Sequence, residues 1–306
     1  MRADVLIFDG RHLLWRTSDA FKDLSVQVSD GREIGTGGIY GFLSVALRVH
    51  NRYGGRVMVA WEGNRKNNFR RKLYPEYKTK ENASPEQLEL IYDMVEQEKR
   101  LKALLRHMGV RQYEADGGEA DDVVGALAKM ASSKGMSTVI YSGDSDLRQL
   151  VDKFTLAVSP GWKGVDTVYD IAKVEEKHGV APELLPDVKA LSGDSSDNIP
   201  GIRGIGAVTA AKLVTTCGDV EKVIQAASSG AEIGAAERFR QPLIEGAEDI
   251  RLYKKLTTVR TDLPLVSLAP DRDQARLIKH FMVYKFRTLV APAELIPVIP
   301  TSYRRS

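Results

Sequence analysis

The sequence contains a single cysteine and lacks any long hydrophobic run. Cys217, alone among 306 residues, excludes an internal disulfide and fits a reducing compartment. No segment approaches the roughly 18 uninterrupted apolar residues that a membrane-spanning helix needs, and the apolar run after Met1 is too short for a signal peptide. We therefore expect a cytoplasmic protein, or one in the host cytoplasm if a phage encodes it, with no membrane partner.

Close histidine pairs and a strong charge imbalance are also missing. The five histidines are His12, His50, His107, His178 and His280. Their spacing argues against a zinc or copper site. With 44 basic and 41 acidic residues the net charge is only +3, and 43% of residues are apolar. This composition is ordinary for a folded domain and excludes a collagen-like or wholly disordered chain.

Short apolar runs alternate with helical patterns in the first half of the chain. Strands are expected over residues 3–8, 56–61, 137–141, 154–159 and 167–169, and helices over 38–52, 85–108 and 119–134. The first strand is expected to end in a turn at Asp9-Gly10. The alternation predicts an α/β fold in which a mostly parallel twisted sheet carries helices on both faces.

Two further features concern the helices. The 85–108 segment has an apolar stripe that indicates core packing, formed by Leu88, Ile91, Val95, Leu101, Leu105 and Met108. After about residue 170 the strand signals fade, and glycine and proline separate short helical segments. We predict an α/β core over residues 1–175, a helical region over 176–295 and a tail over 296–306.

Nine acidic residues stand out: most follow predicted strand ends or open a helix, and the last two are three residues apart, the spacing that places both on one helical face. They are Asp9, Glu62, Glu119, Asp121, Asp122, Asp144, Asp146, Asp194 and Asp197. Taken singly, an Asp-Gly pair usually marks a turn, and an Asp-Asp pair commonly complements a helix dipole. The ligand crevice of an open parallel sheet lies beyond the carboxyl ends of its strands, so we expect these acids to converge.

Converging carboxylates would drive one another's protonation unless cations compensate. Oxygen donors favour Mg²⁺ or Mn²⁺, and one Mg²⁺ usually takes only one or two carboxylates. A pair of ions is therefore predicted, the arrangement that hydrolyses phosphodiesters in line. An EF-hand beginning at Asp144 is rejected, because its sixth position is Gln149 and its twelfth is Thr155.

Residues 64–80 concentrate basic and aromatic side chains. The basic ones are Arg65, Lys66, Arg70, Arg71, Lys72, Lys78 and Lys80, interleaved with Phe69, Tyr74 and Tyr77. Such a mixture suits a single nucleic-acid strand, whose backbone it neutralises and whose bases it stacks; a solvated basic loop is the alternative. Nine of the 41 acids belong to the set above, so the other 32 face 44 basic residues, which favours a polyanionic substrate.

Closely spaced glycines precede an apolar helix at residues 201–206. A dinucleotide-binding motif is excluded, because the preceding Asn-Ile-Pro is no strand and the third glycine position is Thr209. We predict a hairpin between two helices, with Gly204 and Gly206 presenting amides to a DNA phosphate and Lys212 adding charge one turn later. A plain connecting turn is the alternative.

These motifs together resemble those of the 5′ nuclease family, which includes phage flap endonucleases and exonucleases and the 5′→3′ exonuclease domain of bacterial DNA polymerase I. The resemblance covers residues 5–222. Its motifs are Phe8-Asp9-Gly10 with Arg16, Tyr74-Pro75-Glu76-Tyr77-Lys78, Gly118-Glu119-Ala120-Asp121-Asp122, Ser142-Gly143-Asp144-Ser145-Asp146, residues 193–201 and the glycine hairpin.

The resemblance implies a PIN-like 5′-nuclease core that hydrolyses DNA at or near a 5′ end. It implies a helical arch at about 63–110 for the single strand and a helix-three-turn-helix for the duplex. The nine acids would hold two Mg²⁺ ions, replaceable by Mn²⁺, with Asp144 and Asp146 also catalytic. K⁺ is a candidate ion at the helix-three-turn-helix.

Other residues acquire roles by the same resemblance. Lys78 would reach the scissile phosphate, Tyr77 would stack on a displaced base, and Arg16 would steer the 5′ strand. Lys80 would bind DNA in place of an arginine common in the family, and Arg70 and Arg71 are expected to bind DNA as members of the basic segment. The expected partners are DNA with a 5′ flap, nick or 5′ end and an RNA–DNA hybrid, bound by a monomer. Two rival interpretations are a noncatalytic junction-binding protein and a PIN-like ribonuclease.

The sequence departs from the family pattern at two positions. Glu62 stands where the family usually has Asp, and its side chain is one methylene longer. The arginine common three residues after the arch lysine is replaced by Glu81, with Lys80 just before it.

Overall fold

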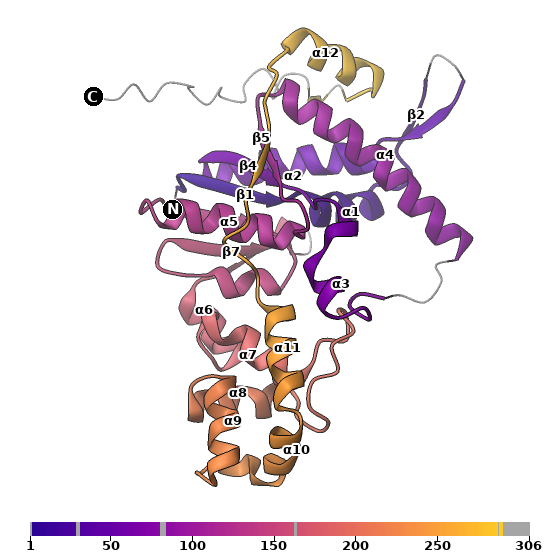
Figure 1. Cartoon of the computed structure of the whole chain (residues 1–306). Helices are drawn as coiled ribbons and strands as arrows, with labels where there is room; N and C mark the ends of the chain where they lie inside the picture. The colour runs from indigo at the N-terminus through magenta and orange to yellow at the C-terminus, as the bar shows by residue number, and fades with distance from the viewer. Residues whose placement is uncertain (1, 29–30, 80–83, 162–163, 287, 290–306) are drawn as a thin grey trace.

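Seven strands form one sheet in the computed structural model, which describes residues 2–28, 31–79, 84–161, 164–286 and 288–289 (Figure 1). The strands are β1 (Val5–Asp9), β4 (Arg56–Ala60), β5 (Arg111–Glu114), β6 (Thr138–Tyr141), β7 (Thr155–Ser159), β8 (Thr167–Tyr169) and β9 (Val266–Leu268). Their spatial order is β8-β7-β6-β1-β4-β5-β9. The five central strands are parallel, and β8 and β9 are antiparallel edges.

The order of the strands creates a crevice beside β1. The chain runs outward through β4 and β5 on one side of β1, then returns to β6 on the other side. Ligands of open α/β sheets bind where the strand order reverses in this way, beyond the carboxyl ends of the strands.

Helices cover both faces of the sheet because β1 is apolar on both. Leu6 and Phe8 point to one face and Val5 and Ile7 to the other, as the pleat requires. The first face is covered by α1 (Gly10–Ala20), α2 (Gly37–Tyr53), α4 (Pro85–His107) and α12 (Gln274–Val283), and the second by α5 (Ala120–Ser132). The predicted fold class is confirmed.

The segment after β8 forms a second apolar core. Its helices are α6 (Ile171–His178), α7 (Leu185–Ser192), α8 (Ala207–Cys217), α9 (Val220–Ser229), α10 (Arg240–Glu245) and α11 (Ala247–Thr257). They lie below the sheet in Figure 1. Among the described residues, no helix is both long and apolar enough to cross a membrane.

Several elements escape sequence analysis. Asp9-Gly10 is not a turn: Asp9 caps α1 by accepting a hydrogen bond from the His12 amide at 3.0 Å. The other elements are short or polar, namely β5, the hairpin of β2 (Ser25–Gln27) and β3 (Glu33–Gly35), α3 (Phe69–Leu73) and β9. The expectation that strands end near residue 170 is wrong, since β9 pairs with β5.

The apolar stripe of α4 is buried only over its second half. Leu101 and Leu105 are buried, whereas Leu88 is 56% exposed and Ile91 37%. The prediction of core packing is therefore wrong for the first two turns. Figure 1 shows the reason, because this end of α4 extends beyond the sheet. A capping box formed by Ser84 and Gln87 starts the helix.

The packing of helix α12 against the first face of the sheet can be tested by mutation. Phe281 is buried in the core of the first face, and its neighbour Met282 is 62% exposed. Phe281→Ala should lower the free energy of unfolding by about 3–5 kcal/mol, because it leaves a cavity. Met282→Ala should change it by no more than about 0.5 kcal/mol. Urea denaturation checks both, and equal losses would contradict this packing.

Candidate functional site

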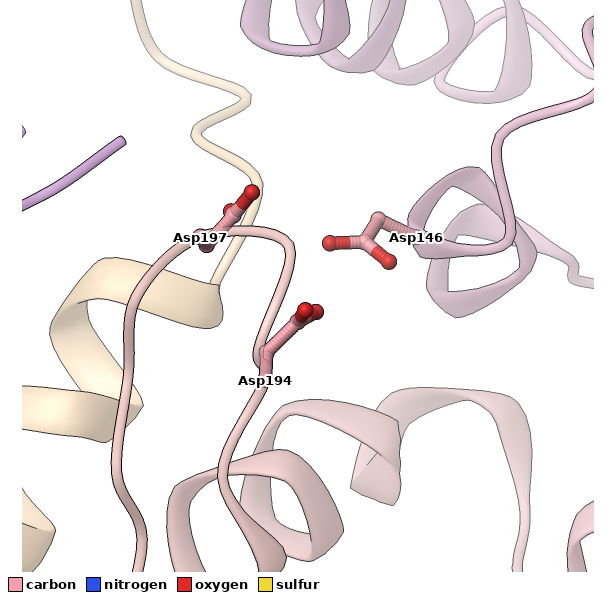
Figure 2. A group of neighbouring side chains, drawn as sticks. All are labelled: Asp146, Asp194 and Asp197. Carbon is pink, nitrogen blue, oxygen red and sulfur yellow. The ribbon is translucent and has the colours of Figure 1, made fainter. Parts of the chain in front are cut away.

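Three aspartates converge beyond the end of β6. Asp146, in the 3-10 helix η2 (Asp146–Leu150), faces Asp194 and Asp197 from the loop after α7 (Figure 2). Each offers a carboxylate oxygen, and these oxygens all lie within 4.8 Å of one another. The loop holds its shape because the amides of Asp194 and Ile199 each donate to the other residue's carbonyl at 2.8 and 2.9 Å. Two segments that are distant in sequence thus form one oxygen-donor set.

A second acidic group adjoins the first. Asp121, at the start of α5, and Asp144, after β6, line a cavity of about 350 Å³ together with the three aspartates. Burial raises the pKa of Asp9, and the nearby charge of Asp144 adds to the shift. Burial likewise raises the pKa of Asp121 well above its usual value, with further contributions from Asp144 and Asp9. The predicted convergence is therefore observed for these six acids.

Two lysines carry the compensating charge. Lys78 Nζ lies 3.0 Å from Glu119 Oε2 and 3.6 Å from Asp197 Oδ1. Lys189 Nζ lies 2.6 Å from Asp194 Oδ2 and also pairs with Asp146. Burial lowers the pKa of each lysine, but the partner carboxylates outweigh it, so both pKa values lie above the ordinary one. Sequence analysis nominated Lys78 and missed Lys189, which lies five residues before Asp194.

Tyr77 does not present its ring for stacking. It is 1% exposed, and its hydroxyl lies 3.0 Å from Glu119 Oε2 and 2.9 Å from Asp197 Oδ2. The prediction that Tyr77 stacks on a displaced base is wrong, because the ring packs in the second apolar core. The Tyr77 hydroxyl instead bridges two of the predicted metal ligands, Glu119 and Asp197.

Arg70 and Asp122 are partners in a buried ion pair. Arg70 is 2% exposed and donates from both terminal nitrogens to Asp122 at 2.6 and 2.8 Å. It also donates to the carbonyls of Leu256 and Thr258 at 2.8 and 2.9 Å. Asp122 accepts from the amides of Glu119 and Arg260 as well. The predictions that Arg70 binds DNA and that Asp122 binds metal are therefore both wrong.

Glu62 is also engaged by protein cations. Its carboxylate accepts from Arg65 Nε at 2.8 Å and pairs with Arg11. Burial raises the pKa of Glu62, but the hydrogen bonds and charges of Arg65 and Arg11 outweigh it and lower the pKa overall. Both oxygens are occupied, so the metal-ligand role predicted for Glu62 does not fit this geometry.

Arg16 is exposed on α1 and lines a separate cavity of about 460 Å³ between α1 and α4. His12 and the half-exposed Trp15 line the same cavity. Sequence analysis missed Trp15, although an aromatic residue next to a nominated arginine is a usable signal. Arg71 is exposed, and Lys80 lies outside the described residues.

The glycine hairpin joins α7 to α8. A Cβ at Gly201, where φ is +65°, would lie 2.2 Å from the Gly193 amide nitrogen, so this turn requires glycine. Gly206 precedes the first residue of α8, and a Cβ there would meet open space. Lys212 is exposed on α8. DNA contacts by Gly204, Gly206 and Lys212 stay predictions.

Family models match nearly the whole described chain. Residues 4–179 match the 5′-3′ exonuclease N-terminal resolvase-like domain, and residues 180–278 match the 5′-3′ exonuclease C-terminal SAM fold. The chain belongs to the 5′-3′ exonuclease family. The resemblance inferred from the motifs is thereby confirmed.

Curated relatives of this family member are bacterial DNA polymerases I. The enzyme of Chloroflexus aurantiacus is 34% identical over 267 residues, covering 85% of this chain and 27% of that protein. The thermostable enzyme of Thermus filiformis is 36% identical over 261 residues, covering 85% and 29%. The chain thus spans less than a third of the length of these relatives.

Solved structures share the fold of this exonuclease family member. The T5 D15 protein co-crystallised with metal ions superposes with a TM-score of 0.69 at 19% identity, covering 94% of this chain and 98% of that one. The catalytic core of Rad2 in complex with DNA substrate gives 0.57 at 17% identity, covering 97% and 93%. The fold is therefore shared across wide sequence divergence.

The Arg70–Asp122 pair generates a stability prediction. Arg70→Met should lower the free energy of unfolding by about 3–5 kcal/mol, because it leaves Asp122 charged and unpaired in the interior. Arg71→Met, a change of the same kind at an exposed position, should cost less than about 1 kcal/mol. Urea denaturation in chelator measures both. A negligible loss for Arg70→Met would restore Arg70 as a candidate surface contact.

The acidic cluster also predicts a pH dependence. Burial raises the pKa of Asp146 to about 6, and the charges of Asp144 and Asp194 add to the effect while Lys189 opposes it. The folded protein therefore binds this proton more tightly than the unfolded chain. The resulting stability is present at low pH and is lost as the pH rises through about 6.

In chelator, the melting temperature should accordingly be higher at about pH 5 than at about pH 7. The pKa shift of Asp146 is worth about 3 kcal/mol in full, at roughly 1.4 kcal/mol for each pKa unit, and about 1.3 kcal/mol of it falls between these two pH values. Asp146→Asn should remove the part of this difference that Asp146 contributes and leave the part due to Asp9 and Asp121, whose pKa values are also raised. Thermal unfolding followed by circular dichroism measures the change. An unchanged pH dependence in the variant would show that Asp146 is not the titrating group.

Proposed function

We propose that this chain is a structure-specific 5′ nuclease that cuts DNA at 5′ flaps and degrades it from 5′ ends, using two Mg²⁺ ions that Mn²⁺ can replace. The observation that carries the proposal is the meeting of carboxylates from separate segments at the sheet's ligand crevice. Membership of the 5′-3′ exonuclease family supports it. RNA–DNA hybrids, a cytoplasmic location and a monomeric state belong to the same proposal.

The residues present fit divalent ions. All donors are carboxylate oxygens. Burial raises the pKa of Asp9, Asp121, Asp146 and Asp197, and neighbouring acidic charges add to each shift, so divalent cations would stabilise the charged forms. Asp146, Asp194 and Asp197 would hold one ion, and Asp9, Asp121 and Asp144 the other. When bound, such ions supply an activated water and stabilise charge on the reacting phosphoryl group.

Protein groups complete the chemistry around that phosphate. Lys78 stays protonated among Glu119, Asp197 and Asp121, so it can neutralise charge that develops on phosphoryl oxygens. Glu119 holds Lys78 in place, and Tyr77 holds Glu119. No side chain is needed as a nucleophile in this scheme.

The DNA strands are assigned to two surfaces. The cavity between α1 and α4 would take the 5′ strand, with Arg16 binding phosphate and Trp15 offering an exposed ring to a base. The hairpin before α8, with Lys212, would take the duplex, and K⁺ is a candidate ion there. The proposed division is a core over 1–175 with an arch at about 63–110, and a helical region over 176–295.

A 5′-flap substrate labelled at each end tests the proposal. Cleavage should require Mg²⁺ and stop with chelator, and Asp194→Asn should slow turnover at least about 100-fold, because metal stabilisation of the transition state amounts to several kcal/mol. Glu176→Gln, on the outer surface of α6, should cut normally. Binding without cleavage would indicate a junction-binding protein, and preference for an all-RNA flap would indicate a ribonuclease.

A further inference from the structure

Two arginines converge on one carboxylate at the end of β4. Arg65 approaches Glu62 with Nε at 2.8 Å from Oε1 and a terminal nitrogen at 2.8 Å from Oε2. Arg11, in the first turn of α1, donates to the same Oε2. The cluster of Arg11, Glu62 and Arg65 carries two positive charges and one negative, so a net charge of +1 remains.

Both guanidinium groups keep donors free for a ligand. The side chain of Arg65 is 59% exposed and that of Arg11 is 24% exposed. Arg65 uses two nitrogens on Glu62 and Arg11 uses one; within the described part of the chain neither makes another side-chain hydrogen bond. Each guanidinium has five N–H donors, so several point away from Glu62.

The cluster adjoins the acidic site: it follows β1 and β4, whereas Asp144 and Asp146 follow β6 on the other side of β1. Arg11 is two residues after Asp9, and Glu62 is two residues after Ala60, which pairs with Asp9. Arg65 begins the 3-10 helix η1 (Arg65–Asn67), directly before Asn68, whose side chain donates to Glu119 at 3.1 Å. Glu119 in turn contacts Lys78, so hydrogen bonds through Asn68 and Glu119 connect Arg65 to the proposed catalytic lysine.

We propose that Arg11 and Arg65, held by Glu62, form a binding site for a backbone phosphate of the DNA strand that is cut. The site rests on the proposed function and extends it: the sequence placed Arg65 only within a basic segment, and the structure adds Arg11 and the carboxylate that holds both. Glu62 orients the two planar groups before DNA arrives, which lowers the entropy lost on binding. Guanidinium groups match phosphate oxygens in shape and bind them through paired hydrogen bonds.

The contacts of the Glu62 carboxylate favour arginine binding over metal binding. A metal ligand at Glu62 would have to displace two arginines, one of them bound to both carboxylate oxygens. Glu62 therefore acts as a positioning residue for the arginines. Its negative charge also weakens their attraction for phosphate, so removing that charge should strengthen DNA binding.

The salt dependence of DNA binding tests the arginines. Fluorescence anisotropy of a labelled 5′-flap oligonucleotide in chelator gives the binding constant over a range of KCl concentrations. The double variant Arg11→Met/Arg65→Met should bind more weakly and reduce the slope of log K against log[KCl] by about 0.7 for each single-strand phosphate that the protein no longer neutralises. Arg276→Met, which removes a paired arginine from α12, is the matched control and should leave the slope unchanged.

Glu62→Gln tests the carboxylate. This variant should bind the flap DNA more tightly than wild type while keeping the wild-type Mg²⁺ affinity, measured by calorimetry without DNA. Asp194→Asn should weaken Mg²⁺ binding in the same experiment. Melting temperatures confirm that each variant is folded.

Three outcomes decide the inference. An Arg11/Arg65 slope equal to that of the Arg276→Met control overturns the phosphate site. Loss of Mg²⁺ affinity in Glu62→Gln, comparable to that in Asp194→Asn, also overturns it and restores Glu62 as a metal ligand. If the double variant shows the expected slope change but the wild-type protein does not cleave the flap, the proposed function fails and the phosphate site stands.

Discussion

Repulsion between carboxylates is the constraint on which the rest of this structure depends. Asp9, Asp121, Asp144 and Asp146 come from three segments that the parallel sheet brings to one edge, and burial there raises the pKa of Asp9, Asp121 and Asp146. Such a cluster is tolerated only with compensating cations. The chain provides two of these itself, Lys78 and Lys189, and the remaining demand is the chemical basis for proposing divalent ions.

The arginines around this cluster form two kinds of ion pair, one buried in the interior and one nearer the surface. On the interior side, Arg70 binds Asp122 and the carbonyls of Leu256 and Thr258 at the C-terminal end of α11, and so connects α11 to the start of α5. Arg11 and Arg65 occupy the outer side with Glu62. The buried arginine therefore pairs entirely within the protein, whereas Arg65 and the partly exposed Arg11 lie nearer the surface beside the same acids.

Sequence patterns predicted the central strands and the longer helices because their apolar residues repeat with the period of each element. They failed for β9 and for the first turns of α4. β9 has three residues and is a strand only because β5 supplies its hydrogen-bond partner. Leu88 and Ile91 have helical spacing, but spacing does not reveal that this end of α4 extends beyond the sheet.

Within the candidate site, too, local sequence patterns predicted some features and long-range packing decided others. The sequence by itself determined which acids follow strand ends, that their donors are all oxygen, and that the basic segment with Lys78 lies next to one of them in the chain. Only the tertiary structure decided that Asp122 and Glu62 are neutralised by arginines, that Tyr77 is buried, and that Lys189 joins the cluster. The reason is that a side chain's chemical type is local, whereas its partner is chosen by packing between segments that are distant in sequence.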